Sequence, residues 1–540
     1  VTRFTNQPLE LNAGDWEADD GGVYKKNGYN EDAACPHPIM PVERLVNIDT
    51  GEEKLQLAFR KGTIWRKLIV SKTVLASSNK VTDLAGSGIA VTSQNARAFI
   101  QYISDMENLN YDLIPEKKSI GRFGYIPGEG FSPFVDGLIF DGDANFKAMF
   151  QTVRSRGSET KWLETAAEVR NMSTTAKIIL AASFASVLLE PLGCLPFFVH
   201  LWGVDSGTGK TVALMVAASV WGDPAVGSYV KTFDGTVVGM EKTAAFLNNL
   251  PFCLDELQLA KDSKGRTTFD VYKLAQGVGR TRGNRAGGVD LTPTWRNCIL
   301  TTGESPLTGT ASGAGAVNRV IDIECKSAQA VIKDGMRISG AVKRNYGFAG
   351  RKFVERLYQP GVVEQVSERY RELFRDLSER DTTEKQAMAA AAIILADELA
   401  CQWIFSGTQQ PLTIEQISEF LASKAAVSAG DRGYKYLCDW VTQNSNKLCG
   451  RSENPNTEVL GALKDGRAYI IRSVFERILQ DAGYSTAAMI SYLKQADLIE
   501  TRGRASTKGK RINGIPTECF CLRLPSVELD DEAGPDEQPL

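Results

Sequence analysis

The feature that most constrains this chain is a glycine-rich turn between an apolar strand and an apolar helix. The strand is predicted over 197–204 (FFVHLWGV) and the helix over 212–221 (VALMVAASVW). Glycine lets the backbone curl so that successive N–H groups point inward, and the helix N-terminus adds partial positive charge. The pattern predicts an α/β domain whose phosphate-binding loop, called the P-loop below, contains Asp205, Ser206, Gly207, Thr208, Gly209, Lys210 and Thr211.

The last two residues of this loop point to a particular ligand. In such a context Lys210 neutralises the β- and γ-phosphates of a nucleotide, and Thr211 offers its hydroxyl to Mg²⁺. Val204 stands where the strict spacing of the motif has a first glycine. We therefore expect ATP and Mg²⁺ as ligands.

Polar residues follow two further apolar strands downstream. The strand before Asp255 and Glu256 (PFCL) ends in paired carboxylates, predicted to hold the Mg²⁺ shell (Asp255) and to polarise the attacking water (Glu256). The strand over 297–301 leads into Thr302, which we expect to contact the γ-phosphate or the water, with Ser305 as the second choice. These side chains are expected at one edge of a sheet, because ligands bind at the carboxyl ends of such strands.

Arginines near these strands have two competing interpretations. Arg319 is expected to reach a γ-phosphate, in its own subunit or in a neighbour's site, or else to form a plain surface salt bridge. The segment 279–288 carries Arg280, Arg282 and Arg285, and predicts a hairpin that turns at Gly287-Gly288. Such a hairpin would track the phosphates of a single strand in a central pore, or else place Arg280 or Arg282 at an adjacent subunit's ATP site.

A second basic cluster lies near the C-terminus. Helices are predicted over 471–482 and 486–496, followed by a basic loop and a strand over 519–524. This order is typical of a winged helix, whose loop contacts the DNA backbone, although many winged helices bind protein instead. The loop is expected to contain Arg502, Arg504, Lys508, Lys510 and Arg511.

Composition excludes several other classes of protein. The formal net charge is -3, from 62 Lys+Arg and 65 Asp+Glu, which argues against a binder held to nucleic acid by bulk charge. The chain has two His and ten Cys without a CxxC pair, so no zinc module is expected. The apolar stretch 178–204 is broken by Glu190 and two prolines, and the first residues lack a signal peptide's apolar core, so no membrane partner and a reducing cytoplasm are expected.

The chain is too long for one core, and shifts in pattern divide it into segments. The N-terminal part combines strand-like runs with one helix near 94–109, and the part after 346 is mostly helical. The expected organisation is a flexible arm (1–35), an α+β domain (36–160), a P-loop domain (161–345), a helical region (346–450), a winged-helix-like domain (457–525) and an acidic disordered tail (526–540).

The motifs FFVHLWGVDSGTGKT, CLDEL, GVGRTRGNRAGG and ILTTGE, in this order over about 40–330, resemble a helicase-like family first catalogued as a domain of unknown function. That family is frequent in prophages and mobile elements, and it resembles the replicative helicases of staphylococcal cassettes and, more remotely, the minichromosome-maintenance and superfamily 3 helicases. The resemblance implies an AAA+ fold, ATP hydrolysis at subunit interfaces, a hexameric ring and 3′-to-5′ movement on single-stranded DNA.

Two functions follow as expectations. The first is an ATP-dependent DNA helicase or translocase of a phage or mobile element, acting on single-stranded or forked DNA, with Arg319 or Arg280 supplied by the neighbouring subunit. The second is an ATP-regulated assembly factor or defence switch that binds nucleotide and a partner protein without unwinding. The basic hairpin favours the first, because a switch does not need it; the intact Lys210, Asp255 and Glu256 argue against a decayed site.

Overall fold

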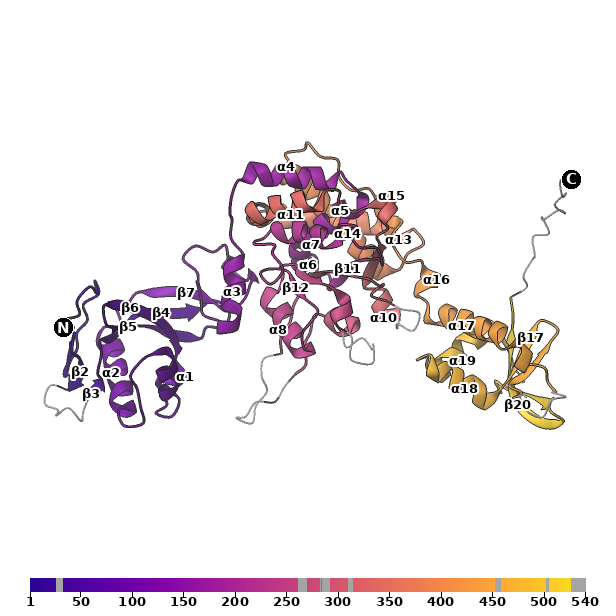
Figure 1. The fold of residues 1–540 in the computed structure, drawn as a ribbon, viewed down its shortest axis with the longest axis horizontal. Helices are drawn as coiled ribbons and strands as arrows, with labels where there is room; N and C mark the ends of the chain where they lie inside the picture. Colours follow the sequence, from indigo (N-terminus) through magenta and orange to yellow (C-terminus); the bar gives the residue numbers. More distant parts are fainter. Residues whose placement is uncertain are drawn as a thin grey trace.

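The computed structural model describes residues 1–25, 33–260, 270–281, 283, 292–308, 314–451, 458–501 and 505–525. Its buried hydrophobic side chains gather in a large central core, an N-terminal core and a C-terminal core with a small satellite. Figure 1 shows the corresponding units in chain order, coloured from indigo through magenta and orange to yellow.

The N-terminal unit is α+β, as expected. Helix α2 begins two residues later than the predicted 94–109, and its buried Tyr102 donates a hydrogen bond to Ile39 O. A three-stranded sheet has the order β1-β2-β3, and a five-stranded sheet has the order β10-β7-β4-β5-β6. The elements are β1 Trp16–Asp19, β2 Gly22–Lys25, β3 Ala33–Cys35, β4 Ile39–Asn47, β5 Glu53–Lys61, β6 Ile64–Ser71, α1 Lys72–Leu75, α2 Ala96–Leu109, β7 Glu116–Ile120 and β10 Ile139–Phe140.

The expectation of a flexible arm over 1–35 is wrong for the residues that the structure describes. Phe4, Leu11 and Trp16 are buried in the N-terminal core, and Trp16 Nε1 donates to Asp105 Oδ2 at 2.9 Å. In β1 buried and exposed residues alternate, so each inward side chain is separated from the next by a polar one. The polar composition of this segment concealed its period-two pattern.

A short connection leads from this unit into the centre. It contains the hairpin β8 (Gly124–Ile126) and β9 (Gly130–Ser132), then α3 (Ala144–Thr152). Phe123, Phe131 and Met149 already belong to the central core. The packing therefore changes from the N-terminal to the central core well before residue 160, the boundary that we expected.

The central sheet has five parallel strands in the order β12-β13-β14-β11-β15. The apolar runs predicted over 197–204, before Asp255 and over 297–301 correspond to its strands β11, β13 and β14. Leu201 pairs with Thr302 and Leu254 with Thr301, so the carboxyl ends of β11, β13 and β14 lie at the same edge. The strands are β11 Phe197–Trp202, β12 Lys231–Thr232, β13 Phe252–Asp255, β14 Cys298–Gly303 and β15 Val320–Glu324.

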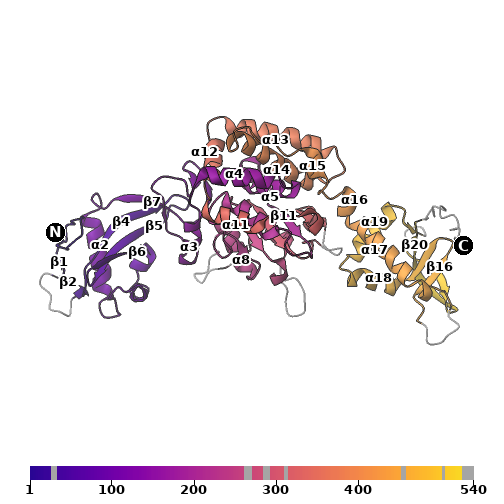
Figure 2. The ribbon, with the colours of Figure 1, turned by 45° about the horizontal axis from the view of Figure 1, so that its top comes forward.

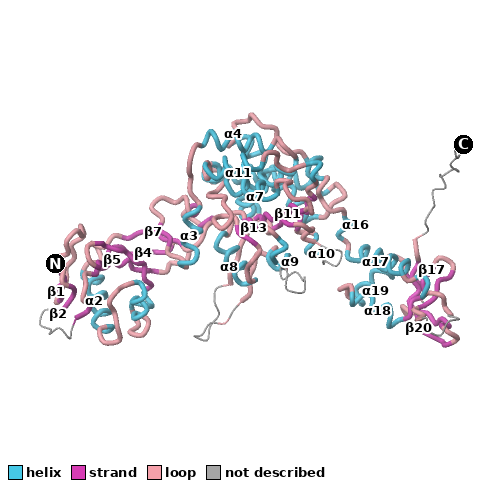
Figure 3. The backbone as a smooth tube through the Cα atoms, in the orientation of Figure 1, coloured by secondary structure: helices cyan, strands magenta, loops and turns pink. Residues whose placement is uncertain are grey.

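Helices surround this sheet, as the cyan segments around the magenta strands of Figure 3 show. Helix α14 contacts α5 and α13, and Figures 1 and 2 both draw α14 beside α5. The region 346–450 therefore largely shares the central core, to which α12, α13 and α14 contribute. The helices are α4 Glu159–Arg170, α5 Thr174–Ala185, α6 Leu189–Leu192, α7 Lys210–Ser219, α8 Val237–Leu247, α9 Val271–Leu274, α10 Ala314–Val317, α11 Gly335–Arg344, α12 Ala349–Leu357, α13 Val362–Ser378, α14 Glu384–Trp403, α15 Ile414–Ser418 and α16 Lys424–Val427.

One helical stretch in the described part of the chain has the length and apolar character of a membrane span. It is Thr174–Leu192, with a mean hydropathy of 1.5, and 78% of it is buried inside the protein. Because α5 packs against α7 and α14 there, this stretch serves as a core helix.

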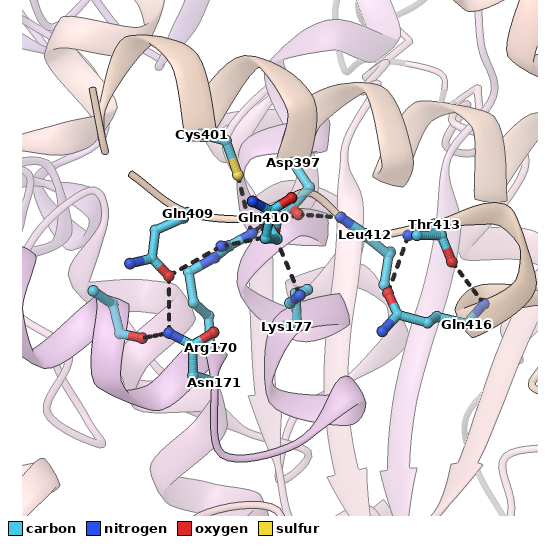
Figure 4. Close-up of polar contacts among 11 residues, drawn as sticks. Arg170, Asn171, Lys177, Asp397, Cys401, Gln409, Gln410, Leu412, Thr413 and Gln416 are labelled. Carbon is cyan, nitrogen blue, oxygen red and sulfur yellow. Dashed lines mark hydrogen bonds and ion pairs between the residues drawn. The ribbon is translucent and has the colours of Figure 1, made fainter. Parts of the chain in front are cut away.

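A buried ion pair joins α4 to α14 (Figure 4). Arg170 Nη2 lies 2.6 Å from both carboxylate oxygens of Asp397, and both side chains are almost fully buried. Leu412 N also donates to Asp397 at 2.7 Å, and Arg170 Nη1 donates to Gln410 O at 3.2 Å. Burial raises the pKa of Asp397, which the Arg170 charge opposes. The pair thereby fixes the loop after α14 against α4.

The C-terminal unit combines helices with antiparallel strands, and it confirms the helices predicted at 471–482 and 486–496. Its sheet has the order β16-β17-β20-β18, with β19 paired to β20. Leu437 and Val441 of α17 share its core with Leu493 of α19, so its packing begins before the expected boundary at 457. The elements are α17 Ala429–Gln443, β16 Gly461–Lys464, β17 Arg467–Ile471, α18 Arg472–Asp481, α19 Thr486–Gln495, β18 Ile499–Glu500, β19 Lys508–Ile512 and β20 Ile515–Arg523. The expected acidic tail, 526–540, lies outside the described residues.

Candidate functional site

The P-loop follows β11 and needs glycine at two crowded positions. A Cβ on Gly203 would lie 2.3 Å from Cys325 O, closer than van der Waals contact permits. Gly209 has φ +88°, and a Cβ there would lie 2.8 Å from Ile332 N. The loop is therefore closely packed against the segment that follows β15, and Val204, 84% exposed, projects at its start.

The Lys210 ammonium is held by the loop itself. Its Nζ donates to Asp205 O at 2.9 Å, to Gly203 O at 3.0 Å and to Thr208 Oγ1 at 3.3 Å. Lys210 is also the first residue of α7, so its charge lies at a helix N-terminus. Two sources of positive charge thus meet in one loop, which favours an anionic ligand there.

A chain of hydrogen bonds connects the loop to the ends of β13 and β14. Thr211 Oγ1 donates to Asp255 Oδ1 at 3.1 Å, and Thr302 Oγ1 donates to the same oxygen. Glu256 N donates to Thr302 Oγ1 at 3.2 Å. Asp255 and Thr302 are only 5% and 3% exposed, so the surrounding protein restricts the movement of both side chains.

Glu256 differs from its neighbour Asp255 in backbone and exposure. Its φ is +63°, a left-handed conformation uncommon for a residue with a side chain, and its side chain is exposed. Strained backbone of this kind persists where the surroundings hold it and is frequent at functional sites. The adjacent carboxylates thus have separate environments: Asp255 is buried between two hydroxyls, and Glu256 is open.

All of these groups line one pocket of about 520 Å³. The predicted loop residues 205–211, Asp255, Glu256 and Thr302 are all brought together there. Sequence reasoning missed Glu304, although it lies only two residues beyond Thr302 at the same strand end. It also missed the segment 331–336, which contributes Ile332, Gly335 and Met336 and carries no motif.

Ser305, our second choice at the end of β14, does not line this pocket. Its carbonyl lies 3.0 Å from His200 Nε2, and His200 Nδ1 lies 2.7 Å from Thr301 Oγ1. Since a carbonyl only accepts, Nε2 carries the hydrogen and Nδ1 accepts from Thr301. Burial lowers the pKa of His200, although Asp322 opposes the effect. The neutral imidazole thus anchors the end of β14, which carries Thr302, and the turn that follows it.

The expectation that Arg319 reaches a phosphate in its own subunit is wrong. Arg319 precedes β15, which is parallel to β11, so it lies at the sheet edge opposite the P-loop. It is 8% exposed, its Nη1 donates to Gly315 O at 2.9 Å, and its guanidinium lies 4.9 Å from the Tyr272 ring. A role in a neighbouring subunit's site stays a prediction.

Backbone pairing joins the residues at the two ends of the basic segment 280–296. Val278 and Thr294 form an antiparallel bridge, Gly279 N donates to Pro293 O at 2.8 Å, and the Thr281 and Thr292 hydroxyls lie 3.0 Å apart. The two described arms therefore run antiparallel at this point, with Arg280 exposed on one of them. Arg282, Arg285 and the expected turn at Gly287-Gly288 lie outside the described residues.

We expected all of the C-terminal basic residues to lie in a loop, and this is wrong for three of them. Lys508, Lys510 and Arg511 belong to strand β19, because the residues after 508 pair along β20. Lys508 forms an ion pair with Glu500, Lys510 Nζ lies 4.2 Å from the Tyr469 ring centroid, and Arg511 is exposed. Arg502 and Arg504 lie outside the described residues. Lys508 is thus already neutralised within the unit.

Within the described ranges, no three His, Cys, Asp or Glu side chains gather to hold a metal ion. Beside the P-loop, by contrast, the Thr211 hydroxyl and the Asp255 carboxylate are adjacent, and oxygen donors of these kinds suit Mg²⁺ when substrate phosphates supply the rest.

Comparison with known proteins places the chain. The structure described as "SCCmec type IV Cch - active helicase" shares the fold, with a TM-score of 0.68 and 18% identity over 96% of this chain and 98% of that chain. A second structure, "The A form apo structure of NrS-1 C terminal region-CTR", has a TM-score of 0.27 and 11% identity over 71% of this chain and 91% of that one. No curated protein matches.

Two family models match the sequence. The model of the Cch helix turn helix domain matches residues 428–527, which include α17 and begin where the C-terminal core begins. The model of a domain of unknown function matches residues 16–294, more than half of the chain, and includes the P-loop and the carboxylate pair. The resemblance expected from the motifs is confirmed, and the chain belongs to the DUF927 family.

Proposed function

We propose that this protein is an ATP-hydrolysing DNA helicase or translocase of a mobile element, with an AAA+ core. One observation carries the proposal. A continuous set of hydrogen bonds joins Thr211, Asp255, Thr302 and the Glu256 N–H, and it lies in the same pocket as Lys210. A site for phosphoryl transfer needs positive charge, a metal-binding pair and a base, and little other chemistry from the protein. The residues that would meet these requirements line one pocket.

The residues fit ATP with Mg²⁺. Lys210 and the N-terminus of α7 would bind the β- and γ-phosphates, and Thr211 with Asp255 would hold the cation. Mg²⁺ would neutralise charge that develops on the phosphate oxygens during transfer. In this scheme the Asp255 side chain stays buried between two hydroxyl donors.

Glu256 is the proposed general base, because its carboxylate is the exposed member of the pair. It would accept a proton from the water that attacks the γ-phosphate. The sequence led us to expect that Thr302 contacts the γ-phosphate or the water. We propose that it acts as a positioning residue instead, because its hydroxyl donates to Asp255 and accepts the Glu256 N–H. It thereby sets the relative position of the two carboxylates.

Subunit association and DNA binding rest on further features. The strand order β12-β13-β14-β11-β15 supports an AAA+ core, and the likeness of fold to a structure described as an active helicase supports a motor. In the proposed hexameric ring, six copies share interfacial ATP sites, and Arg319 or Arg280 would serve the neighbouring site. The 280–296 hairpin and the helix-turn-helix unit would contact DNA.

The test measures ATP turnover by the full chain with and without single-stranded DNA. We expect DNA to stimulate turnover, Lys210→Ala to abolish it, and Glu256→Gln to abolish turnover while retaining ATP binding. Met172→Leu, a conservative change outside the pocket, is the matched control and should preserve the rate. Turnover that survives Lys210→Ala would refute the site, and turnover indifferent to DNA would favour the nucleotide switch.

A further inference from the structure

One wall of the pocket differs chemically from the rest. The segment that follows β15 is held against the P-loop, since Val331 N donates to Thr208 O at 2.8 Å and Ser327 N to Asp205 Oδ2 at 3.0 Å. Gly335 lies against the first turn of α7, because a Cβ added to it would be 3.3 Å from Val212 Cγ2. The segment therefore forms a wall beside the P-loop.

The topology separates this wall from the acidic groups. In the sheet, β13 and β14, which carry Asp255, Glu256 and Thr302, lie on one side of β11, and β15 lies on the other. Because the segment 331–336 follows β15, it approaches the pocket from the side opposite the carboxylates. Phosphates bound in the P-loop with their terminal group toward Glu256 would thus direct the nucleoside toward 331–336.

The side chains with which this wall lines the pocket are apolar, whereas Lys333 and Asp334 of the same segment do not line it, and Asp334 accepts from Arg337 N at the start of α11. Val212, Ile332 and Met336 line this wall together with Gly335, whereas the ionisable side chains of the pocket belong to the P-loop and to the ends of β13 and β14. Met336 is 89% exposed, an unusual state for a large apolar side chain beside a pocket. Methionine is flexible and polarisable, so it adapts to flat ligands of different shape.

We propose that this wall is the nucleoside subsite and that it holds the base by apolar contact, without reading the base's hydrogen-bonding edge. The inference rests on the proposed function and adds the substrate class: nucleoside triphosphates in general, not ATP alone. An apolar pocket separates similar ligands by roughly 10- to 200-fold at most, whereas one built to hydrogen-bond a ligand reaches about 10⁴-fold. The side chains of Val212, Ile332 and Met336 carry no conventional hydrogen-bonding donor that could read the edge of a base.

The experiment compares ATP, GTP, CTP and UTP with inorganic tripolyphosphate, which occupies only the phosphate end. For the unmodified chain we expect kcat/KM values for the four nucleotides within about tenfold of one another. Met336→Ala should raise KM for all four by about fivefold with kcat unchanged, because it removes contact made equally in the ground and transition states. It should leave the inhibition constant of tripolyphosphate unchanged.

Two variants serve as controls. Met336→Leu keeps the apolar contact and should restore KM, and Ile64→Ala removes an exposed side chain (64%) from the N-terminal unit and should change nothing. A preference for ATP of more than about 200-fold, beyond what apolar contact supplies, or an equal loss of tripolyphosphate binding in Met336→Ala, would overturn this inference alone. Absence of turnover with all four nucleotides would overturn the proposed function, and this inference with it.

Discussion

Replacing Thr302 by valine removes one hydroxyl and keeps the shape of the side chain. The hydroxyl donates to the Asp255 carboxylate and accepts from Glu256 N, and Thr302 is 3% exposed, so water does not replace it. A hydrogen bond to a charged group contributes about 1.5–3 kcal/mol. If the hydroxyl positions the carboxylates for reaction, Thr302→Val lowers kcat by about 10- to 100-fold, since each ~1.4 kcal/mol changes a rate tenfold.

The assay is steady-state ATP turnover at saturating DNA, with nucleotide binding measured separately. KM for ATP should change little, because Thr302 makes no contact that the phosphates need for binding. Thr302→Ser restores the hydroxyl and should recover most of the rate, while a melting curve shows whether each variant is folded. An unchanged kcat in a folded Thr302→Val protein, or a Thr302→Ser protein as slow as the valine variant, would refute the positioning role.

Three further predictions concern other parts of the chain. Asp397→Asn should lower the free energy of unfolding by about 3–5 kcal/mol in urea titration, because it leaves the buried Arg170 charge without its partner; a loss below 1 kcal/mol would show that the pair is dispensable. Burial lowers the pKa of His200 below its ordinary 6.5, so folding favours the neutral ring. The contribution of His200 to the free energy of unfolding is therefore complete above pH 6.5, and it is lost as the pH falls through the folded-state pKa. The pH dependence of unfolding in that acidic range should therefore weaken in His200→Gln, and an unchanged profile would contradict the assignment. If Arg319 serves the neighbouring site, mixing inactive Arg319→Ala with inactive Glu256→Gln should restore turnover at the mixed interfaces, whereas no recovery in mixed assemblies would exclude that role.

The pocket could be predicted largely because its residues belong to short local patterns. Gly207, Gly209, Lys210 and Thr211 occupy one continuous turn, and Asp255 with Glu256 directly follows an apolar strand. Parallel pairing then brings these strand ends together without further information. The sequence ranked Thr302 ahead of Ser305, and of these two only Thr302 lines the pocket.

Other features depended on contacts between distant residues. The wall formed by 331–336 meets the P-loop more than a hundred residues away in sequence, and no motif marks it. The end of the sheet at which Arg319 lies depends on the direction of β15 relative to β11. The sequence around Arg319 does not reveal that direction. Trp16 was misplaced in a flexible arm because its packing partner, α2, lies about ninety residues downstream. Local periodicity carries no information about such partners.

The central claim is that nucleotide hydrolysis in this pocket drives movement on DNA. Its most direct test is strand displacement on a forked duplex by the full chain, with ATP and Mg²⁺, alongside Glu256→Gln under the same conditions. The account predicts displacement by the unmodified chain that stops in Glu256→Gln although that variant still binds ATP and DNA. Hydrolysis that DNA stimulates, without displacement or movement on any forked or single-stranded substrate, would contradict it.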